Sequence, residues 1–271
     1  MARRWDKKEE KKYREELIDL YVKKNKALGE IALILGLAEQ TVFQRLGRLG
    51  IKTQPHLKKN YLLKPKDIKI PKKYSTQMAE FFGIMLGDGN LTHFQIQVNL
   101  GNKEIEYADY VRKLIGKIFK TNPKIATRAT GYHDVYLGST ILTSWLSKEG
   151  LVYNKVKAQV DVPKWIFSRK EFMNAFLRGF FDTDGSVYKL KFGIQVSLTN
   201  HSYPMLISLH KMLSKLQYNP SSINTHRIYL TRKKDLERFF KEVKPKNPKH
   251  VRRFEYFVSM RRSDSGYSSR L

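Results

Sequence analysis

The sequence predicts an α+β fold in which two related halves follow a small all-helical module. One apolar pattern occurs twice, in residues 79–91 and 175–187, and the offsets 175 − 79 and 184 − 88 are both 96. A strand pattern of alternating apolar and polar residues follows each copy. Residues 9–50, in contrast, show helical periodicity. An internal repeat of this kind indicates two equivalent structural units within one chain.

The two copies of the pattern read as helices that are lined on one face by small residues. Small side chains recur at every fourth position: Ala79, Gly83 and Gly87, then Ala175, Gly179 and Thr183. Residues four apart share a helix face. A glycine inside a helix costs about 1 kcal/mol relative to alanine, and a close approach of two helix backbones would explain that cost. The sequence therefore predicts that the two helices pack against each other.

Each predicted helix ends at an Asp-Gly pair, Asp88-Gly89 and Asp184-Gly185. We expect the glycines to end the helices by adopting the left-handed backbone conformation. Packing of the helices would bring the two carboxylates together, where they would repel unless a cation lay between them. Mg²⁺ prefers oxygen ligands, so the pair is a candidate divalent-metal site. A metal ion there could activate water and assist displacement at a phosphodiester.

These two stretches resemble the paired motifs of the LAGLIDADG homing endonucleases, in the form that carries both motifs in one chain. The resemblance implies that the motif helices form the central interface, packed at Gly83, Gly87, Gly179 and Thr183. It implies that Asp88 and Asp184 bind Mg²⁺ or another divalent cation, with Gly87 and Thr183 as further candidate metal-site positions. It also implies that each half forms a curved antiparallel sheet and that the sheets make a saddle on double-stranded DNA. The alternative is a structural helix pair with surface aspartates.

The composition indicates a polyanionic partner. Lys+Arg number 52 against 25 Asp+Glu, a net charge of +27. Nucleic acid is the simplest candidate; an anionic membrane is disfavoured because no apolar run approaches the ~20 residues of a spanning helix. The absence of cysteine excludes disulfides and cysteine-based zinc sites. Without a signal sequence, we expect a cytoplasmic or nucleoid-associated protein that is not secreted. Some relatives are embedded in inteins, but the ends of this chain lack splice residues, so we expect a free-standing protein.

Residues 1–52 are predicted to form a DNA-binding helix-turn-helix domain. A helix over residues 9–24 precedes two helices in 27–36 and 37–50. Ile31, Ala32, Ile34, Leu35, Val42, Leu46 and Leu49 are expected on their buried faces. The second helix would enter the major groove and present Glu39, Gln40, Thr41, Gln44, Arg45 and Arg48. A plain packing module is the alternative. A basic linker is predicted over residues 53–74.

The two halves are predicted over residues 75–160 and 161–271, the second with a basic tail that ends flexibly. Expected strands are 94–100, 124–130, 133–138, 193–199, 221–225 and 227–231. Expected helices after the motifs are 102–119, 139–149, 203–217 and 232–243. We expect apolar residues of the strands, Phe94 among them, to face the helices and their polar residues to face the DNA. The alternative is an ordinary solvated sheet face.

Candidate DNA contacts on the strands are Gln95, Gln97, Asn99, Arg128, Lys189, Lys191, Gln195, Ser197 and Thr199. Members of the family usually add a Lys or Gln near the strand ends to orient solvent, and no central lysine is obvious here. Candidates for that role are Lys103, Lys189, Gln97 and Gln195, and His93, His133 and His201 could titrate near neutral pH.

The predicted function is that of a site-specific double-strand DNA endonuclease, monomeric through internal pseudo-twofold symmetry. Both motif aspartates are retained, which favours hydrolysis over binding alone. The alternative is a non-cleaving nucleic-acid binder on the same scaffold, either a transcription regulator or an intron RNA maturase. A structural protein with a basic surface would explain the charge but not the repeat.

Overall fold

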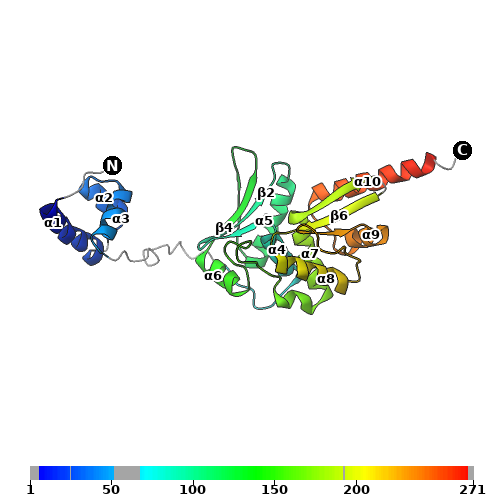
Figure 1. The fold of residues 1–271 in the computed structure, drawn as a ribbon, viewed down its shortest axis with the longest axis horizontal. Helices are drawn as coiled ribbons and strands as arrows, with labels where there is room; N and C mark the ends of the chain where they lie inside the picture. The colour runs from blue at the N-terminus through cyan, green and yellow to red at the C-terminus, as the bar shows by residue number, and fades with distance from the viewer. Residues whose placement is uncertain (1–5, 25, 52–67, 192, 268–271) are drawn as a thin grey trace. The chain divides into compact units, whose positions relative to one another are not determined.

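The computed structural model describes residues 6–24, 26–51, 68–191 and 193–267 (Figure 1). The chain divides into two compact units, Met1–Leu63 and Lys64–Leu271. The predicted linker falls largely on residues 53–67, outside the described part of the chain. Its last residues belong to the second unit instead: Ile68 and Ile70 pack on the core of that unit, and the Lys69 amide donates to the Phe119 carbonyl at 3.0 Å.

The first unit is a bundle of short helices: α1 (Lys7–Leu17), a π-helical extension (Ile18–Lys23), α2 (Leu28–Leu35) and α3 (Glu39–Arg48). The side chain of Asp6 caps α1 by accepting from the Glu9 amide at 2.8 Å. Leu17, Ile31 and Leu46 are fully buried between the helices. The expectation that Ile34 is buried is wrong, since 52% of it is exposed on the outer side of α2.

The second unit is centred on two packed helices, α4 (Thr76–Leu86) and α7 (Lys170–Asp184). Every residue of α4 from 78 to 86 is buried. A Cβ at Gly83 would lie 2.8 Å from the Phe180 nitrogen and would overlap the Phe176 carbonyl oxygen. A Cβ at Gly179 would lie 2.9 Å from the Ile84 nitrogen and would overlap the Glu80 carbonyl oxygen. The two helix backbones therefore touch at reciprocal glycines, which explains why the sequence keeps them inside helices.

The first half builds a four-stranded antiparallel sheet in the order β1-β2-β4-β3. Its elements are β1 (Gly89–Leu91), β2 (Gln95–Leu100), α5 (Ile105–Phe119), β3 (Lys124–Thr127), β4 (His133–Gly138) and α6 (Thr140–Lys148). Val98 pairs with Gly89 on one side and Val135 on the other, all on the core face. Phe94 precedes β2 and is 51% exposed, so the expectation that it faces the core is wrong.

The second half builds a smaller antiparallel sheet, β5-β6-β7. A 3₁₀ turn (Lys164–Ser168) leads into α7, and the later elements are β5 (Gly185–Leu190), β6 (Gly193–Thr199), α8 (Tyr203–Lys215), β7 (Arg227–Leu230), α9 (Lys233–Glu242) and α10 (Pro248–Tyr267). The strand predicted over 221–225 is wrong, because Thr225 and His226 turn the chain at φ of 44° and 62°. Only an isolated bridge joins Asn224 to Arg227.

The basic tail forms the helix α10 as far as Tyr267 (red in Figure 1), which the sequence analysis did not predict, and the flexibility of the end of the chain stays a prediction. Phe254, Phe257 and Val258 of α10 pack against the core of the second unit. The predicted α+β class with antiparallel sheets is confirmed. None of the helices in the described ranges is long and apolar enough to cross a membrane.

Candidate active site and nucleic-acid interface

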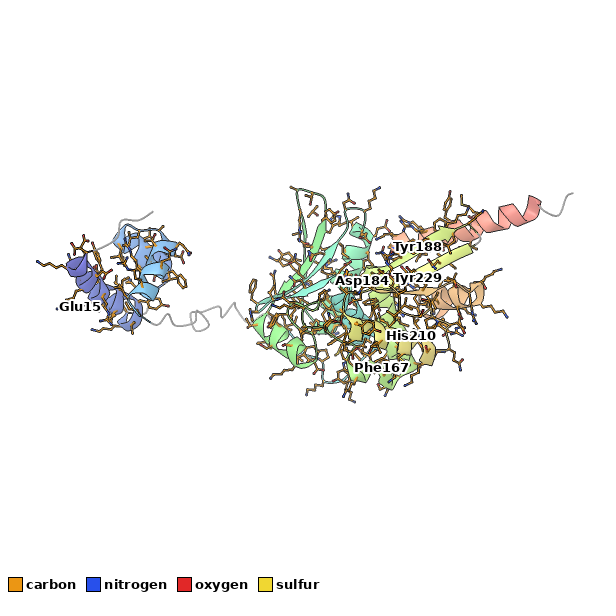
Figure 2. All side chains as sticks on the ribbon, viewed as in Figure 1. Glu15, Phe167, Asp184, Tyr188, His210 and Tyr229 are labelled. Atoms are coloured by element: carbon orange, nitrogen blue, oxygen red, sulfur yellow. The ribbon has the colours of Figure 1, made fainter. Side chains whose placement is uncertain are left out.

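Asp88 and Asp184 lie at the ends of the packed helices, one from each half. Asp184 is the last residue of α7 (labelled in Figure 2), and Asp88 lies between α4 and β1. Burial and then the charge of Asp88 raise the pKa of Asp184 to about 7. Burial also raises the pKa of Asp88, although Lys155 opposes the shift. The two carboxylates thus share one poorly solvated environment.

The glycines that follow the aspartates do not adopt the left-handed conformation, so that part of the prediction is wrong. Gly185 has φ −89° and ψ 163°, and Gly89 is not among the glycines with positive φ. A Cβ at Gly89 would lie 2.8 Å from the Met85 carbonyl carbon, and one at Gly185 would overlap the Phe181 ring and lie 2.7 Å from its Cε2 atom. Glycine is needed because the chain folds tightly over the last helical turn. As a result, the strands β1 and β5 begin directly after the two aspartates. The sequence analysis did not predict these strands.

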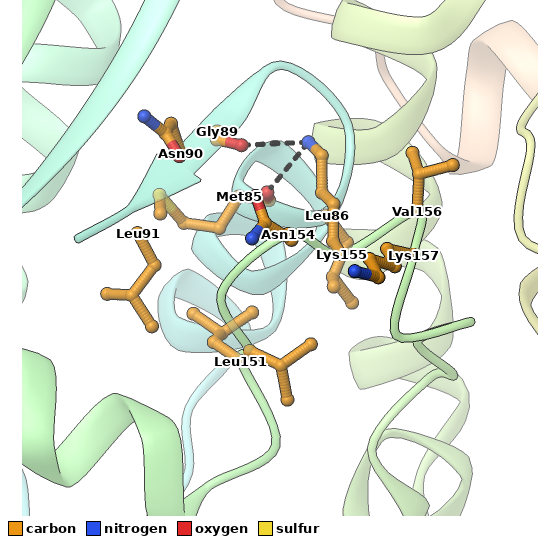
Figure 3. A pocket seen from close by; sticks show the side chains of 11 residues that line it. Met85, Leu86, Gly89, Asn90, Leu91, Leu151, Asn154, Lys155, Val156 and Lys157 are labelled. Atoms are coloured by element: carbon orange, nitrogen blue, oxygen red, sulfur yellow. Dashed lines mark hydrogen bonds between the residues drawn. The ribbon is translucent and has the colours of Figure 1, made fainter.

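Lys155 places a cation at this site from the connection between the halves. Its ammonium group donates to the carbonyl oxygens of Met85 at 3.3 Å and Gly89 at 2.8 Å (dashed in Figure 3), and also to that of Gly87. Burial lowers the pKa of Lys155, whereas attraction to Asp184 and Asp88 opposes the shift. A cavity of about 540 Å³ adjoins this side chain (Figure 3). Sequence reasoning missed Lys155 because it searched the strand ends.

The residues at the helix ends fit a divalent cation. Two carboxylates and the Gly87 carbonyl are hard oxygen donors, and the contact of Lys155 with that carbonyl shows that a cation is favoured there. Among the residues that the structure describes, no group of three or more His, Cys, Asp or Glu side chains could hold a metal ion. The Thr183 hydroxyl instead donates to helix carbonyls, those of Gly179 and Phe180. Thr183 therefore acts in packing, and the prediction of Thr183 as a metal-site position is not supported by its contacts.

The polar neighbours of the aspartates differ from those predicted. Asn200, which follows β6, donates its amide to Asp184 Oδ2 at 3.2 Å. Glu104, which precedes α5, raises the pKa of Asp88 by its charge. Asn200 follows a strand end and could have been singled out on that basis. Nothing in the local pattern around Glu104 marks it, because its nearness to Asp88 arises from the turn at residues 101–104.

Several of the predicted helper residues make other contacts. Lys103 is exposed in that turn, and Gln97 lies in mid-strand, where its side chain accepts from Gln95 at 3.5 Å. His133 is buried and contacts the Thr127 hydroxyl at 3.1 Å. The two remaining predicted histidines contact aromatic rings: His93 lies against Tyr153, and His201 against His226.

The polar face of the first sheet carries the predicted Gln95, Gln97 and Asn99, all half-buried. Gln97 pairs with Asn90 on one side and Tyr136 on the other, and cross-strand partners share a face. Asn90 is exposed and Tyr136 is half-buried, and the sequence analysis singled out neither of them. Arg128 forms a bidentate ion pair with Asp134, at 2.6 and 2.9 Å, so its charge is partly offset.

The polar face of the second sheet retains Gln195 and Thr199 as half-buried residues. Tyr188, labelled in Figure 2, is the cross-strand partner of Gln195 and covers Ser197, whose hydroxyl lies 2.7 Å from that of Tyr188. Ser197 is fully buried, so its prediction as a DNA contact is wrong.

The two lysines predicted beside the second sheet are separated in the structure. Lys189 pairs with Ile194, which places it on the core side, where it contacts Met260 of α10 at 3.5 Å. Lys189 is nevertheless exposed, so its role as a DNA contact stays a prediction. Lys191 is exposed in the turn between β5 and β6.

The predicted recognition helix α3 presents Gln40 and Gln44 to solvent, whereas Thr41 is half-buried. Arg48 is held by an ion pair with Glu10 of α1. Arg45 is half-buried, and burial lowers the pKa of its guanidinium group. The two arginines are thus engaged within the module, and its reading of DNA stays a prediction.

Comparison with known proteins identifies a LAGLIDADG-like domain over residues 171–244, which spans α7 to α9. This match confirms the resemblance that the repeated motif predicted. The chain is 30% identical over 118 residues to the replication factor C small subunit of Methanocaldococcus jannaschii, covering 43% of this chain and 6% of that protein. It is 30% identical over 160 residues to the ribonucleoside-diphosphate reductase NrdEB subunit alpha of Bacillus subtilis, covering 52% and 14%. The chain thus spans a small part of each of these relatives.

Similar solved structures include a WhiA domain, a meganuclease and a homing endonuclease, all described as LAGLIDADG proteins or homing endonucleases. The N-terminal LAGLIDADG domain of DUF199/WhiA has a TM-score of 0.45 at 16% identity, covering 66% of this chain and 89% of that chain. The LAGLIDADG meganuclease I-AabMI bound to uncleaved DNA has a TM-score of 0.47 at 13% identity, covering 72% and 92%. The homing endonuclease I-DmoI in complex with DNA and Mn has a TM-score of 0.44 at 14% identity, covering 62% and 96%.

Proposed function

We propose that the chain is a site-specific double-strand DNA endonuclease that hydrolyses phosphodiesters with a divalent metal ion. The observation that carries the proposal is the pair of half-buried carboxylates, Asp88 and Asp184, held together at the ends of two packed helices. One carboxylate comes from each half, which suits a substrate with two strands. The net charge of +27 suits a polyanion.

Asp88, Asp184 and the Gly87 carbonyl would hold Mg²⁺ or another divalent cation. When bound, such an ion activates water and stabilises negative charge on the phosphate. Asn200 orients the Asp184 carboxylate through its amide. Lys155 supplies positive charge beside both carboxylates while its ammonium group donates to the Gly87 carbonyl.

Binding would use the polar sheet faces. Gln95, Gln97, Asn99, Gln195 and Thr199 are the side chains that we assign to base edges, with Gln40 and Gln44 of α3 as a second, separate contact. The protein would act as a monomer in the cytoplasm or at the nucleoid. If about ten phosphates are neutralised, the log–log dependence of the binding constant on salt has a slope near −9.

Selective cleavage of a randomised plasmid library in Mg²⁺ tests the proposal, with sequencing of the broken ends. We expect double-strand breaks at one preferred sequence, and their loss in Asp88→Asn and in Asp184→Asn. Asp109→Asn is the matched control, since Asp109 lies on α5 in ion pairs with Arg112 and Lys113. Breaks that persist in both site variants, or no breaks with Mg²⁺ or Mn²⁺, would overturn the proposal.

A non-cleaving nucleic-acid binder, either a transcription regulator or an intron RNA maturase, is the second candidate. The observation that favours it is Lys155, whose ammonium compensates both carboxylates without any metal ion. Tight binding to duplex DNA or structured RNA, without cleavage in any divalent metal, would support this candidate.

A further inference from the structure

A basic hollow lies outside the polar sheet faces, where residues 101–107 meet residues 247–253. Its volume is about 420 Å³. Four cations and two carboxylates line it: Lys103, Lys249, Arg252, Arg253, Glu104 and Glu106. The hollow therefore carries a net charge of 4 − 2 = +2.

Two of the cations are already neutralised. Lys249 contacts Glu104 at 3.3 Å, and Arg252 contacts Glu106 at 3.1 Å. Lys103 and Arg253 are exposed, and within the described part of the chain neither has a carboxylate partner. The excess positive charge of the hollow is thus carried by side chains that are free to contact an external anion.

The walls of the hollow are held rigidly. Asn247 is fully buried, and its amide donates to Glu104 at 2.7 Å and to the Asp182 carbonyl at 2.9 Å. The Asp182 carboxylate accepts from the backbone of Lys246 at 2.8 Å and from that of Asn247 at 3.1 Å. The backbone that carries the cations is therefore ordered before an anion binds, which limits the entropic cost of binding to the side chains of Lys103 and Arg253.

The hollow adjoins the Asp88 side of the site. The charges of Glu104 and Lys249 both act on Asp88. The Asn99 amide donates to the Asp88 carbonyl at 3.3 Å, two residues before the wall that starts at Gly101. A DNA strand that lies over Asp88 would pass close to this group of cations.

On the Asp184 side, the residue at the position equivalent to Glu104 is uncharged. Ser202 precedes α8 as Glu104 precedes α5, and its hydroxyl donates to the Val160 carbonyl. The neighbouring Tyr203 amide donates to Gln159 at 3.0 Å. The carboxylate–cation network therefore breaks the pseudo-symmetry of the two halves.

We propose that the basic hollow binds backbone phosphates of the DNA strand that passes Asp88, without reading its bases. The inference rests on the proposed function as a DNA-binding protein. Exposed Lys and Arg side chains are suited to phosphodiester oxygens, and such contacts fix register while carrying no sequence information. The two strands are consequently held unequally, with additional phosphate contacts on the Asp88 side.

The test is the salt dependence of binding to a labelled duplex of arbitrary sequence, measured by fluorescence anisotropy in EDTA. The double variant Lys103→Gln/Arg253→Gln removes two phosphate contacts, so the slope should become shallower by about 1.8. The control is Lys117→Gln/Lys211→Gln, which removes the same charge from exposed positions on α5 and α8. We expect its slope to equal that of the unchanged protein.

A slope in the Lys103/Arg253 variant that equals that of the control would overturn the inference and leave DNA binding intact. An unchanged protein whose binding does not depend on salt would overturn both the inference and the proposed function. Thermal unfolding with inorganic phosphate separates a small-anion site from a backbone site. Stabilisation by phosphate that vanishes in the double variant, with an unchanged slope, would assign the hollow to a free anion instead.

Discussion

The two motif helices share a backbone arrangement but differ in chemistry at their contact. With the offset of 96, Glu80 of α4 corresponds to Phe176 of α7, and Arg178 of α7 corresponds to Phe82 of α4. Glu80 is 2% exposed and accepts from Arg178 at 2.8 Å. Tyr110 donates to the other oxygen of Glu80. Each half thus contributes one charged residue to the ion pair. At the position that is charged in one half, the other half has a phenylalanine.

This difference shows what keeps the two halves distinct. If two copies of α4 packed together, each Glu80 would face Phe82 without a cation. If two copies of α7 packed together, each Arg178 would face Phe176 without a carboxylate. A buried charge without a partner is strongly unfavourable, so the ion pair disfavours both alternatives. The reciprocal glycines permit any of these pairings, whereas the ion pair selects the one between the halves.

The largest expected effect is that of breaking the ion pair. Glu80→Ala leaves Arg178 partly buried without its carboxylate and should lower the free energy of unfolding by about 3–5 kcal/mol. Glu80→Met/Arg178→Met should cost less than the sum of its single variants, with a coupling of about 0.5–3 kcal/mol. Urea unfolding of the four proteins measures this. Additive single effects would contradict the assignment of specificity to the pair.

In the contact between the motif helices, substitution by alanine should be less well tolerated at the central glycines, Gly83 and Gly179, than at Gly87 near its end. Gly83→Ala and Gly179→Ala force a Cβ against backbone atoms and should each cost about 1–3 kcal/mol or more. Gly87→Ala meets the Thr183 side chain instead, so Thr183→Gly should recover much of its loss.

Gly47→Ala in α3 is the matched control for the helix glycines. Nothing lies within 4 Å of a Cβ at Gly47, so this substitution should stabilise its helix by up to about 1 kcal/mol. Thermal unfolding of each variant checks the set. Equal losses at Gly47 and Gly83 would show that helix propensity, not the approach of the helices, decides the effect.

Removal of the Lys155 ammonium group should destabilise the protein, because the two motif carboxylates then repel each other without a cation beside them. Lys155→Met leaves three backbone carbonyls and two carboxylates without their ammonium partner, and we expect a loss of about 1–3 kcal/mol in EDTA. Added Mn²⁺ should restore more stability in this variant than in the unchanged protein. The exposed Lys157→Met is the control. No difference between the two variants would remove Lys155 from the site.

Asp184 is also expected to make the stability depend on pH. Its pKa is about 7 in the folded protein against an ordinary value of 3.8, so between these values the folded state retains a proton that the unfolded state loses. The free energy of unfolding in EDTA should therefore fall as the pH rises from about 4 to about 7, by at most about 1.4 kcal/mol per pH unit.

Asp184→Asn should reduce this slope, because the amide does not titrate. Asp182, whose burial raises its pKa to about 8, remains in that variant and maintains part of the dependence. Thermal unfolding across this pH range is the measurement. An identical slope in the variant would mean that the Asp184 carboxyl is better solvated than its position indicates.

Periodicity and spacing were enough to predict those parts of the molecule that depend on local pattern. The motif helices, the alternating strands and the glycine-lined contact all follow from residues a few positions apart. The predictions failed where a local pattern did not determine exposure or conformation. Ser197 alternates correctly but lies buried under Tyr188. α10 was missed because its composition is basic and rich in small polar residues.

The sequence by itself determined the duplicated architecture and the pair Asp88 and Asp184, because a repeat and its helix ends can be identified from residue order. Only the tertiary structure decided which side chains surround those carboxylates. Lys155, Asn200 and Glu104 come from a connection and two turns, whose positions depend on the packing of distant elements. Regular elements follow their local periodicity, whereas the site depends on where irregular segments are held by that packing.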